Sequence, residues 1–198
     1  MCYMPVKILM LAFLITVVGG VSLVSAADAD ADEEIPGFIT SDSINLSLPQ
    51  PTDYSLSSSE IADLLFMREE EQMAHDLYMV WSGMYSRPIF GNIAQAEQTH
   101  VNSVQLLIDR YNLSSEMSGN LSSGYHNPDI QALSETLLAQ GNVSLTDALK
   151  AGVMIEEVDI SDLNKAIANT TRADIIFVYT NLRKGSESHL KAFNSQLS

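Results

Sequence analysis

Cysteine is nearly absent from this chain, because the one cysteine among its 198 residues is Cys2. Cys2 lies ahead of an apolar N-terminal segment, so cleavage of that segment would leave a protein with no disulfide and no thiolate ligand. Basic residues are also few, since 10 Lys and Arg stand against 25 Asp and Glu. Phosphate binding needs a basic surface, so this acidity argues against nucleic acid as a partner. It suits an exported protein that is kept soluble by its charge.

Long apolar runs are missing except at the N-terminus, where Lys7 precedes the stretch ILMLAFLITVVGGVSLVSA. A basic residue, an apolar segment and a small-residue end together predict a secretory signal peptide over residues 1–26, cleaved after Ala26. The alternative is an uncleaved membrane anchor, since the run is at the short end for a transmembrane helix. We therefore expect a protein that is secreted or held on the extracellular side of the membrane. Asn-x-Ser/Thr sequons hint at the same location; they occur at Asn45, Asn112, Asn120, Asn142 and Asn169.

The rest of the chain divides into a tether and one domain. Residues 27–57 are acidic and then rich in Ser and Pro, with neither a helical nor a strand period, and they predict a flexible tether. Residues 58–198 have the length and composition of one domain with one core.

This domain is predicted to be all-α, because apolar residues recur at helical spacing and strand signals are nearly absent. Short connections join the first helix to the second and the third to the fourth, whereas a long connection with a short extra helix links the second to the third. This order is typical of a ferritin-like four-helix bundle with a long crossover. The predicted long helices cover residues 59–85, 88–111, 145–167 and 172–196, and the short one covers 129–139.

Polar residues interrupt the apolar stripe of each long helix near its middle. The run Glu69–Glu71 must place at least one acid inward on the first helix, and the periodicity slightly favours Glu70. Asp159 can share the inward edge of the third helix, although it could instead cap a break in that helix. The other inward polar residues are Glu97 and His100 on the second helix, Glu156 on the third, and Ser186 and His189 on the fourth.

Buried acids on three helices need a common cation, because a buried, unpaired carboxylate costs several kcal/mol. Carboxylates and imidazoles without a thiolate suit iron or manganese, and zinc is a further candidate. Two metal ions bridged by carboxylates would disperse the charge best. One Glu-x-x-His match can arise by chance, so the prediction depends on the coincidence of acids and histidines on all four helices.

The segments "REEEQMAHDLYMVW", "PIFGNIAQAEQTHVNSVQLLIDRYNL", "GVMIEEVDISDL" and "NLRKGSESHLKAF" resemble an uncharacterised prokaryotic branch of the ferritin-like superfamily. Its wider relatives, the rubrerythrins, carry a Glu on helix 1, Glu-x-x-His on helices 2 and 4, and a Glu on helix 3. On helix 1 the rubrerythrin-like spacing Glu-x-x-Ala-x-x-x-Tyr matches Glu71, Ala74 and Tyr78 and favours Glu71 over Glu70. The resemblance thus implies metal ligation by Glu71, Glu97, His100, Glu156 and His189.

The chain departs from that pattern at Ser186, where the relatives have a ligand Glu. Asp159 could replace the missing carboxylate, or the site could hold a single metal ion. The leading hypothesis is a secreted metal-binding protein that acts as a di-iron-type oxidoreductase, either a ferroxidase or a peroxide-reducing enzyme, with Tyr78 or Tyr179 as a nearby phenol. The alternative is a non-enzymatic acidic surface module with a structural metal site or a buried polar network. The resemblance leaves a homodimer open.

Overall fold

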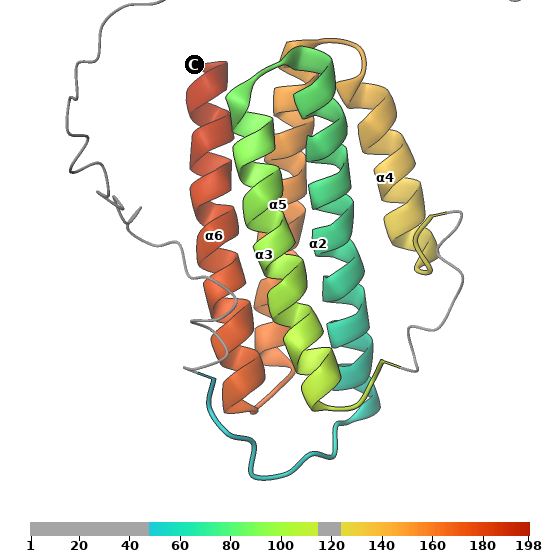
Figure 1. The fold of residues 1–198 in the computed structure, drawn as a ribbon, viewed down its shortest axis with the longest axis vertical. Helices are drawn as coiled ribbons and strands as arrows, with labels where there is room; N and C mark the ends of the chain where they lie inside the picture. Colours follow the sequence, from blue (N-terminus) through green and yellow to red (C-terminus); the bar gives the residue numbers. More distant parts are fainter. Residues whose placement is uncertain (1–47, 115–123) are drawn as a thin grey trace, which may run out of the picture. The chain divides into compact units, whose positions relative to one another are not determined.

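The computed structural model describes residues 48–114 and 124–198. Within these ranges the chain is all-helical, with five α-helices and no strand (Figure 1). The predicted helix positions are confirmed, with ends that shift by only one or two residues. The signal peptide predicted over residues 1–26 lies outside the described ranges. The helices are α2 (Ser58–Tyr85), α3 (Pro88–Arg110), α4 (Pro128–Gly141), α5 (Leu145–Ala168) and α6 (Ala173–Leu197).

Local signals explain where these helices begin. Ser57 caps α2 by accepting a hydrogen bond from the Glu60 amide, and the Glu60 side chain accepts one from the Ser57 amide. Ser86 ends α2 in a left-handed conformation, and Pro88 opens α3, so the turn between these two helices needs only two residues. Ser144 caps α5 by accepting a hydrogen bond from the Asp147 amide.

The four long helices lie side by side (Figure 1). The pairs α2–α3 and α5–α6 make the largest interfaces, and α2 also packs against α5 and α3 against α6. α3 and α5 run in the same direction, and between them in the chain α4 runs the opposite way and packs against α2 and α5 (Figure 1). Among the described residues no helix is long and apolar enough to cross a membrane.

The apolar core consists of two clusters, one toward each end of the four helices. A layer of buried polar residues separates them, because the acids and histidines occupy the middle of each helix. On α2, for example, Met67 belongs to one cluster and Met73 to the other, with Glu70 and Glu71 between them. Leu107, Ile108, Leu163, Val178 and Leu182 pack in the first cluster, and Trp81, Phe90, Ala148, Ile155 and Phe193 pack in the second.

The described end of the predicted tether, residues 48–57, has no helix or strand but is held against the domain. Leu48 is buried in the first apolar cluster. Arg110 donates to the carbonyl of Pro49, and Arg172 donates to the carbonyls of Asp53 and Ser55. Leu48 therefore adds to the apolar core, and hydrogen bonds hold the rest of this segment against the domain.

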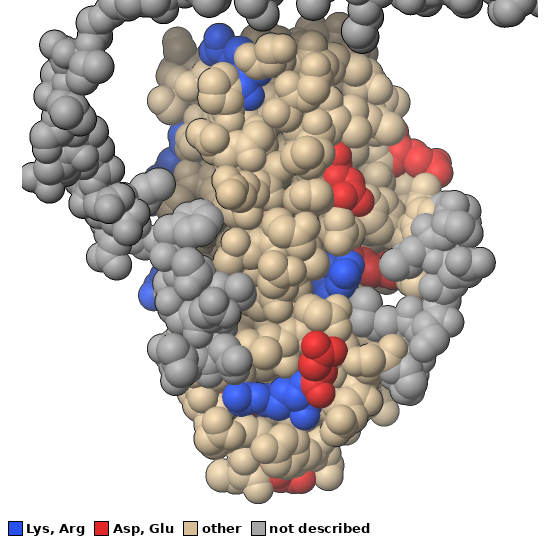
Figure 2. Space-filling model, in the orientation of Figure 1, with Lys and Arg blue, Asp and Glu red and all other residues tan. Residues whose placement is uncertain are grey.

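The face of the molecule in Figure 2 carries basic and acidic residues in small, separate groups. Uncharged residues make up most of that face, and its Lys and Arg side chains form no continuous basic surface of the kind that nucleic acid requires.

Candidate metal site

Glu97 lies at the centre of the polar layer. It precedes His100 by three residues on α3, so both side chains leave the same face of the helix. Oε2 of Glu97 lies 2.7 Å from Nδ1 of His100, and Oε1 lies 2.8 Å from Nδ1 of His189 on α6. The two imidazole rings stack with centroids 5.6 Å apart. Each oxygen of one carboxylate thus faces a different histidine.

Two further carboxylates complete two groups of potential ligands that share Glu97. Oε2 of Glu71 on α2 lies 3.1 Å from Nδ1 of His100. Oε2 of Glu156 on α5 lies 3.6 Å from Nδ1 of His189. In each group one atom per residue falls within 4.8 Å of the others. The groups are Glu71, Glu97 and His100, and Glu97, Glu156 and His189.

Tyr78 orients Glu156 from α2. Its hydroxyl is fully buried and donates a 2.6 Å hydrogen bond to Oε1 of Glu156. That bond leaves Oε2 of Glu156 directed toward His189. Tyr179, the other phenol considered from the sequence, belongs to the first apolar cluster and is not in the polar layer.

Two more acids adjoin the ligand groups. Asp159 and Glu70 line a small pocket together with Glu71, Glu97 and Glu156, and this pocket has no room for a water molecule. Both oxygens of Asp159 and Oε2 of Glu70 are buried without a hydrogen-bond partner. α5 continues unbroken through Asp159, so the idea that this residue caps a helical break is wrong.

Comparison with known proteins places this arrangement in a family. Residues 60–198 match the Uncharacterized protein domain (DUF2202). The chain belongs to the DUF2202 family. The uncharacterized protein MJ0754 of Methanocaldococcus jannaschii is 41% identical over 138 residues, which cover 70% of this chain and 75% of that protein. A crystal structure of hypothetical protein MJ0754 from Methanococcus jannaschii superposes with a TM-score of 0.69 at 38% identity, covering 75% of this chain and 85% of that one.

Acidic groups outnumber potential cations in the polar layer of this DUF2202 domain. Five acids are almost completely buried in the polar layer, whereas it contains only two imidazoles as potential cations. Water cannot solvate the excess negative charge, and a buried carboxylate without a partner costs several kcal/mol. The five acids are Glu70, Glu71, Glu97, Glu156 and Asp159.

The pKa shifts reflect the same imbalance. Burial raises the pKa of Glu71 to about 7 although His100 opposes the shift. Burial likewise raises the pKa of Glu156 and, more strongly, that of Asp159, which nearby Glu71 raises further. Glu97 is the exception: burial acts to raise its pKa, but His100 and His189 outweigh burial and lower it. The carboxyl groups of Glu71, Glu156 and Asp159 thus tend to keep their protons, whereas Glu97 loses its proton beside two imidazoles.

The donor set of the DUF2202 domain fits a metal pair. Both oxygens of Glu97, Oε1 of Glu71 and Nδ1 of His189 are buried without a hydrogen bond of good geometry, although they lie close together. Carboxylate and imidazole ligands suit iron, manganese and zinc. The two potential ligand groups share one carboxylate, that of Glu97.

All residues that the sequence predicted as metal ligands lie in or beside the polar layer of the DUF2202 domain. Of the two candidates on α2, Glu71 contacts His100 and Glu70 lies in the pocket beside Asp159. Ser186 is buried on α6, and its hydroxyl donates to the carbonyl of Leu182. Sequence reasoning missed Gly185, whose Cα faces the His100 ring so closely that a Cβ would lie 2.5 Å from Nε2. A glycine inside a predicted helix was the available signal.

Proposed function

We propose that this DUF2202 domain is a ferritin-like four-helix bundle that binds two transition-metal ions, bridged by Glu97. The observation that carries the proposal is that the two oxygens of Glu97 face two different histidines within two overlapping ligand groups. Iron and manganese are the preferred metals because all ligands are carboxylates and imidazoles, and zinc is the third candidate.

The direction of the helices supports the ferritin-like assignment. α3 and α5 run parallel with a long crossover between them (Figure 1). Each of the four long helices contributes a buried or half-buried potential ligand near its middle. Glu71 and His100 would hold one ion, and Glu156 and His189 would hold the other.

Asp159 supplies the carboxylate that Ser186 lacks. Ser186 has a short side chain on α6, and its hydroxyl is close enough to Asp159 to lower the pKa of that acid, although burial dominates and raises it. Asp159 on α5 thus lies beside position 186, where the rubrerythrin-like pattern has a glutamate. The number of acids around the metal pair is preserved by this exchange.

The reaction we propose for this exported protein is oxidation of ferrous to ferric iron, with dioxygen or peroxide as the electron acceptor that is reduced. Bound iron or manganese supplies one-electron redox chemistry. The chain's own part is to exclude water, since the ligands are buried, and to hold a proton beside Glu156 on the Tyr78 hydroxyl.

Metal stoichiometry of substituted proteins tests the binding proposal. The protein is loaded separately with Fe²⁺ under anaerobic conditions, Mn²⁺ and Zn²⁺, desalted, and analysed for bound metal. We expect two ions in the wild type, one after Glu71→Gln or Glu156→Gln, and loss of both after Glu97→Gln, because Glu97 belongs to both groups. Glu187→Gln, an exposed acid on α6, is the matched control. Equal losses in the three ligand variants would contradict a bridging role for Glu97.

A second candidate is a non-enzymatic surface module. The observation that favours it is that Glu97 already has two imidazole neighbours, so a polar network of shared protons could stabilise the layer by itself. Oxygen consumption after addition of Fe²⁺ separates these functions. Turnover that Glu97→Gln abolishes would support the oxidase. Two bound ions without turnover would leave a structural metal site, and no bound metal would leave the polar network.

A further inference from the structure

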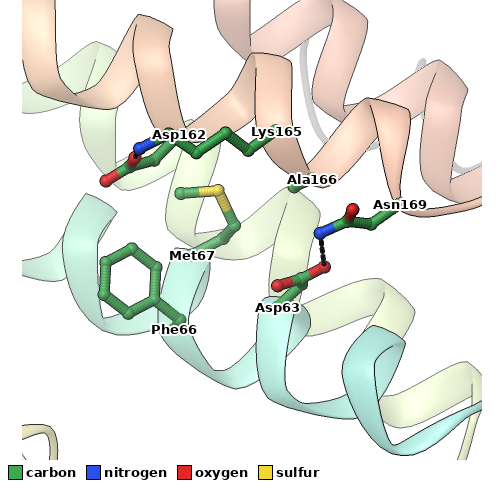
Figure 3. A pocket seen from close by; sticks show the side chains of 7 residues that line it. All are labelled: Asp63, Phe66, Met67, Asp162, Lys165, Ala166 and Asn169. Atoms are coloured by element: carbon green, nitrogen blue, oxygen red, sulfur yellow. Dashed lines mark hydrogen bonds and ion pairs between the residues drawn. The ribbon is translucent and has the colours of Figure 1, made fainter.

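A second pocket opens on the surface where α2 packs against α5. Its volume is about 210 Å³, and Figure 3 shows Asp63, Phe66 and Met67 from α2 facing Asp162, Lys165 and Ala166 from α5. Asn169 closes one end through a hydrogen bond to Asp63. Two carboxylates therefore stand at a surface opening whose floor is formed by apolar side chains.

This surface pocket lies one helical turn from the buried pocket of the metal site. Met67 in the surface pocket and Glu70 in the buried one are three residues apart on α2. Asp162 and Asp159 have the same spacing on α5. Residues three apart on a helix share one face. The pair on α2 and the pair on α5 therefore both lead along the contact between these helices, from the surface pocket to the buried pocket.

Glu70 lines the buried pocket one helical turn from Met67 of the surface pocket, and the proposed metal pair does not use it. It is only 2% exposed, and its Oε2 has no hydrogen-bond partner. Glu70 directly precedes the proposed ligand Glu71 on α2 and lines the buried pocket together with Asp159.

We propose that divalent cations reach the buried site along the contact between α2 and α5, passing from Asp162 by way of Glu70 to Asp159. This inference rests on the proposed metal site and adds the path by which that site is filled. A cation leaving water needs successive carboxylates to replace its hydration shell, and these three acids provide them from the surface to the ligand groups. Each end of the path is defined by an observed pocket.

Lys165 controls this path at the surface. Its ammonium group pairs with Asp162, and the side chain is otherwise 70% exposed. An arriving cation must displace this resident positive charge from Asp162. Removal of the charge at Lys165 should therefore speed metal uptake, whereas removal of the charge at Asp162 or Glu70 should slow it.

The test measures how fast Co²⁺ enters the full-length protein. Trp81 is the one tryptophan of the chain and packs against Tyr78 with ring centroids 6.0 Å apart, so Co²⁺ in the site should quench its fluorescence. We expect Glu70→Gln to slow quenching by at least about tenfold, Asp162→Asn to slow it less, and Lys165→Gln to accelerate it, within the range of electrostatic effects on rates. Glu187→Gln on α6 should leave the rate unchanged.

Metal content after long incubation separates a path from a ligand. We expect each of these variants to reach the wild-type stoichiometry, and circular dichroism should show an unchanged helix content. An unaltered rate for Glu70→Gln, a lower final stoichiometry for that variant, or slower uptake by Lys165→Gln would each overturn the path. If the wild type bound no metal at all, the metal site itself would be refuted, and that outcome is distinct from an altered rate at full occupancy.

Discussion

The backbone of Gly185 on α6 lies directly against the imidazole ring of His100 on α3. A Cβ at this position would lie 2.5 Å from Nε2 and 2.8 Å from Cε1 of that ring. Such distances are far inside van der Waals contact, so any side chain at Gly185 must move the imidazole. The position of His100 between Glu71 and Glu97 therefore depends on the absence of a side chain on the neighbouring helix.

Gly185→Ala should reduce metal binding from two ions to one. The added methyl group displaces His100, which belongs to the group with Glu71, and leaves His189 in place. Isothermal titration with Mn²⁺ measures the change. Gly83→Ala is the control, because a Cβ there meets no atom within 4 Å and alanine favours a helix by up to about 1 kcal/mol over glycine. Two ions bound with unchanged affinity in Gly185→Ala would contradict the prediction.

Tyr78→Phe should destabilise the metal-free protein by about 1–3 kcal/mol, because it leaves a buried oxygen of Glu156 without its donor. The ring itself still packs against Trp81 and Phe193. Urea unfolding in the presence of EDTA measures the difference. Tyr179→Phe is the matched control: it also removes a buried phenol, but one whose hydroxyl has no hydrogen-bond partner among the described residues. Equal losses in both variants would show that the bond to Glu156 contributes nothing specific.

Proton release should accompany metal binding. Burial raises the pKa of Glu71 to about 7, and for His189 the lowering by burial is outweighed by Glu97 and Glu156, which raise its pKa to about 10. Ligands must lose these protons to bind a metal. We therefore expect affinity for Mn²⁺ to increase between pH 6 and about 8. Calorimetric titrations in buffers of different ionisation enthalpy measure the protons that the protein releases to the buffer when it binds Mn²⁺. An affinity independent of pH would contradict ligation by these groups.

The stability of the metal-free protein should change in the opposite direction. Both groups have raised pKa values in the folded protein, so their contribution is complete below the ordinary values of 4.5 for Glu71 and 6.5 for His189. It is lost as the pH rises through about 7 and then about 10. Thermal unfolding with EDTA should show this loss, and saturating Mn²⁺ should abolish it. A metal-free protein that gains stability between pH 7 and 9 would contradict these shifts.

Much of this arrangement could be predicted from the sequence, because each helix has one buried face and its period is visible. Glu97, His100, Glu156 and His189 interrupt apolar stripes, and the structure brings them together. Their metal chemistry stays a prediction. The run Glu69–Glu71 shows the limit of periodicity, since all three acids are buried and each has different surroundings.

The remaining features depend on contacts between elements that are distant in sequence. Glu69 accepts hydrogen bonds from the amides of His126 and Asn127 at the start of α4, which no helical period reveals. Leu48 completes a core cluster from a segment with no regular structure. The need for glycine at position 185 follows only from where α3 places its histidine.

Asp159→Ser should have opposite effects on stability and on metal binding. Both oxygens of Asp159 are buried without a partner, so their removal should stabilise the metal-free protein by about 1–3 kcal/mol. The same change removes the carboxylate that compensates for Ser186, so metal affinity should fall by at least about tenfold. Adding Ser186→Glu to this variant should restore affinity, because a carboxylate then enters the same space from α6. Urea unfolding with EDTA and titration with Mn²⁺ provide the two measurements. A double variant that binds metal no better than Asp159→Ser would show that the two positions do not exchange roles.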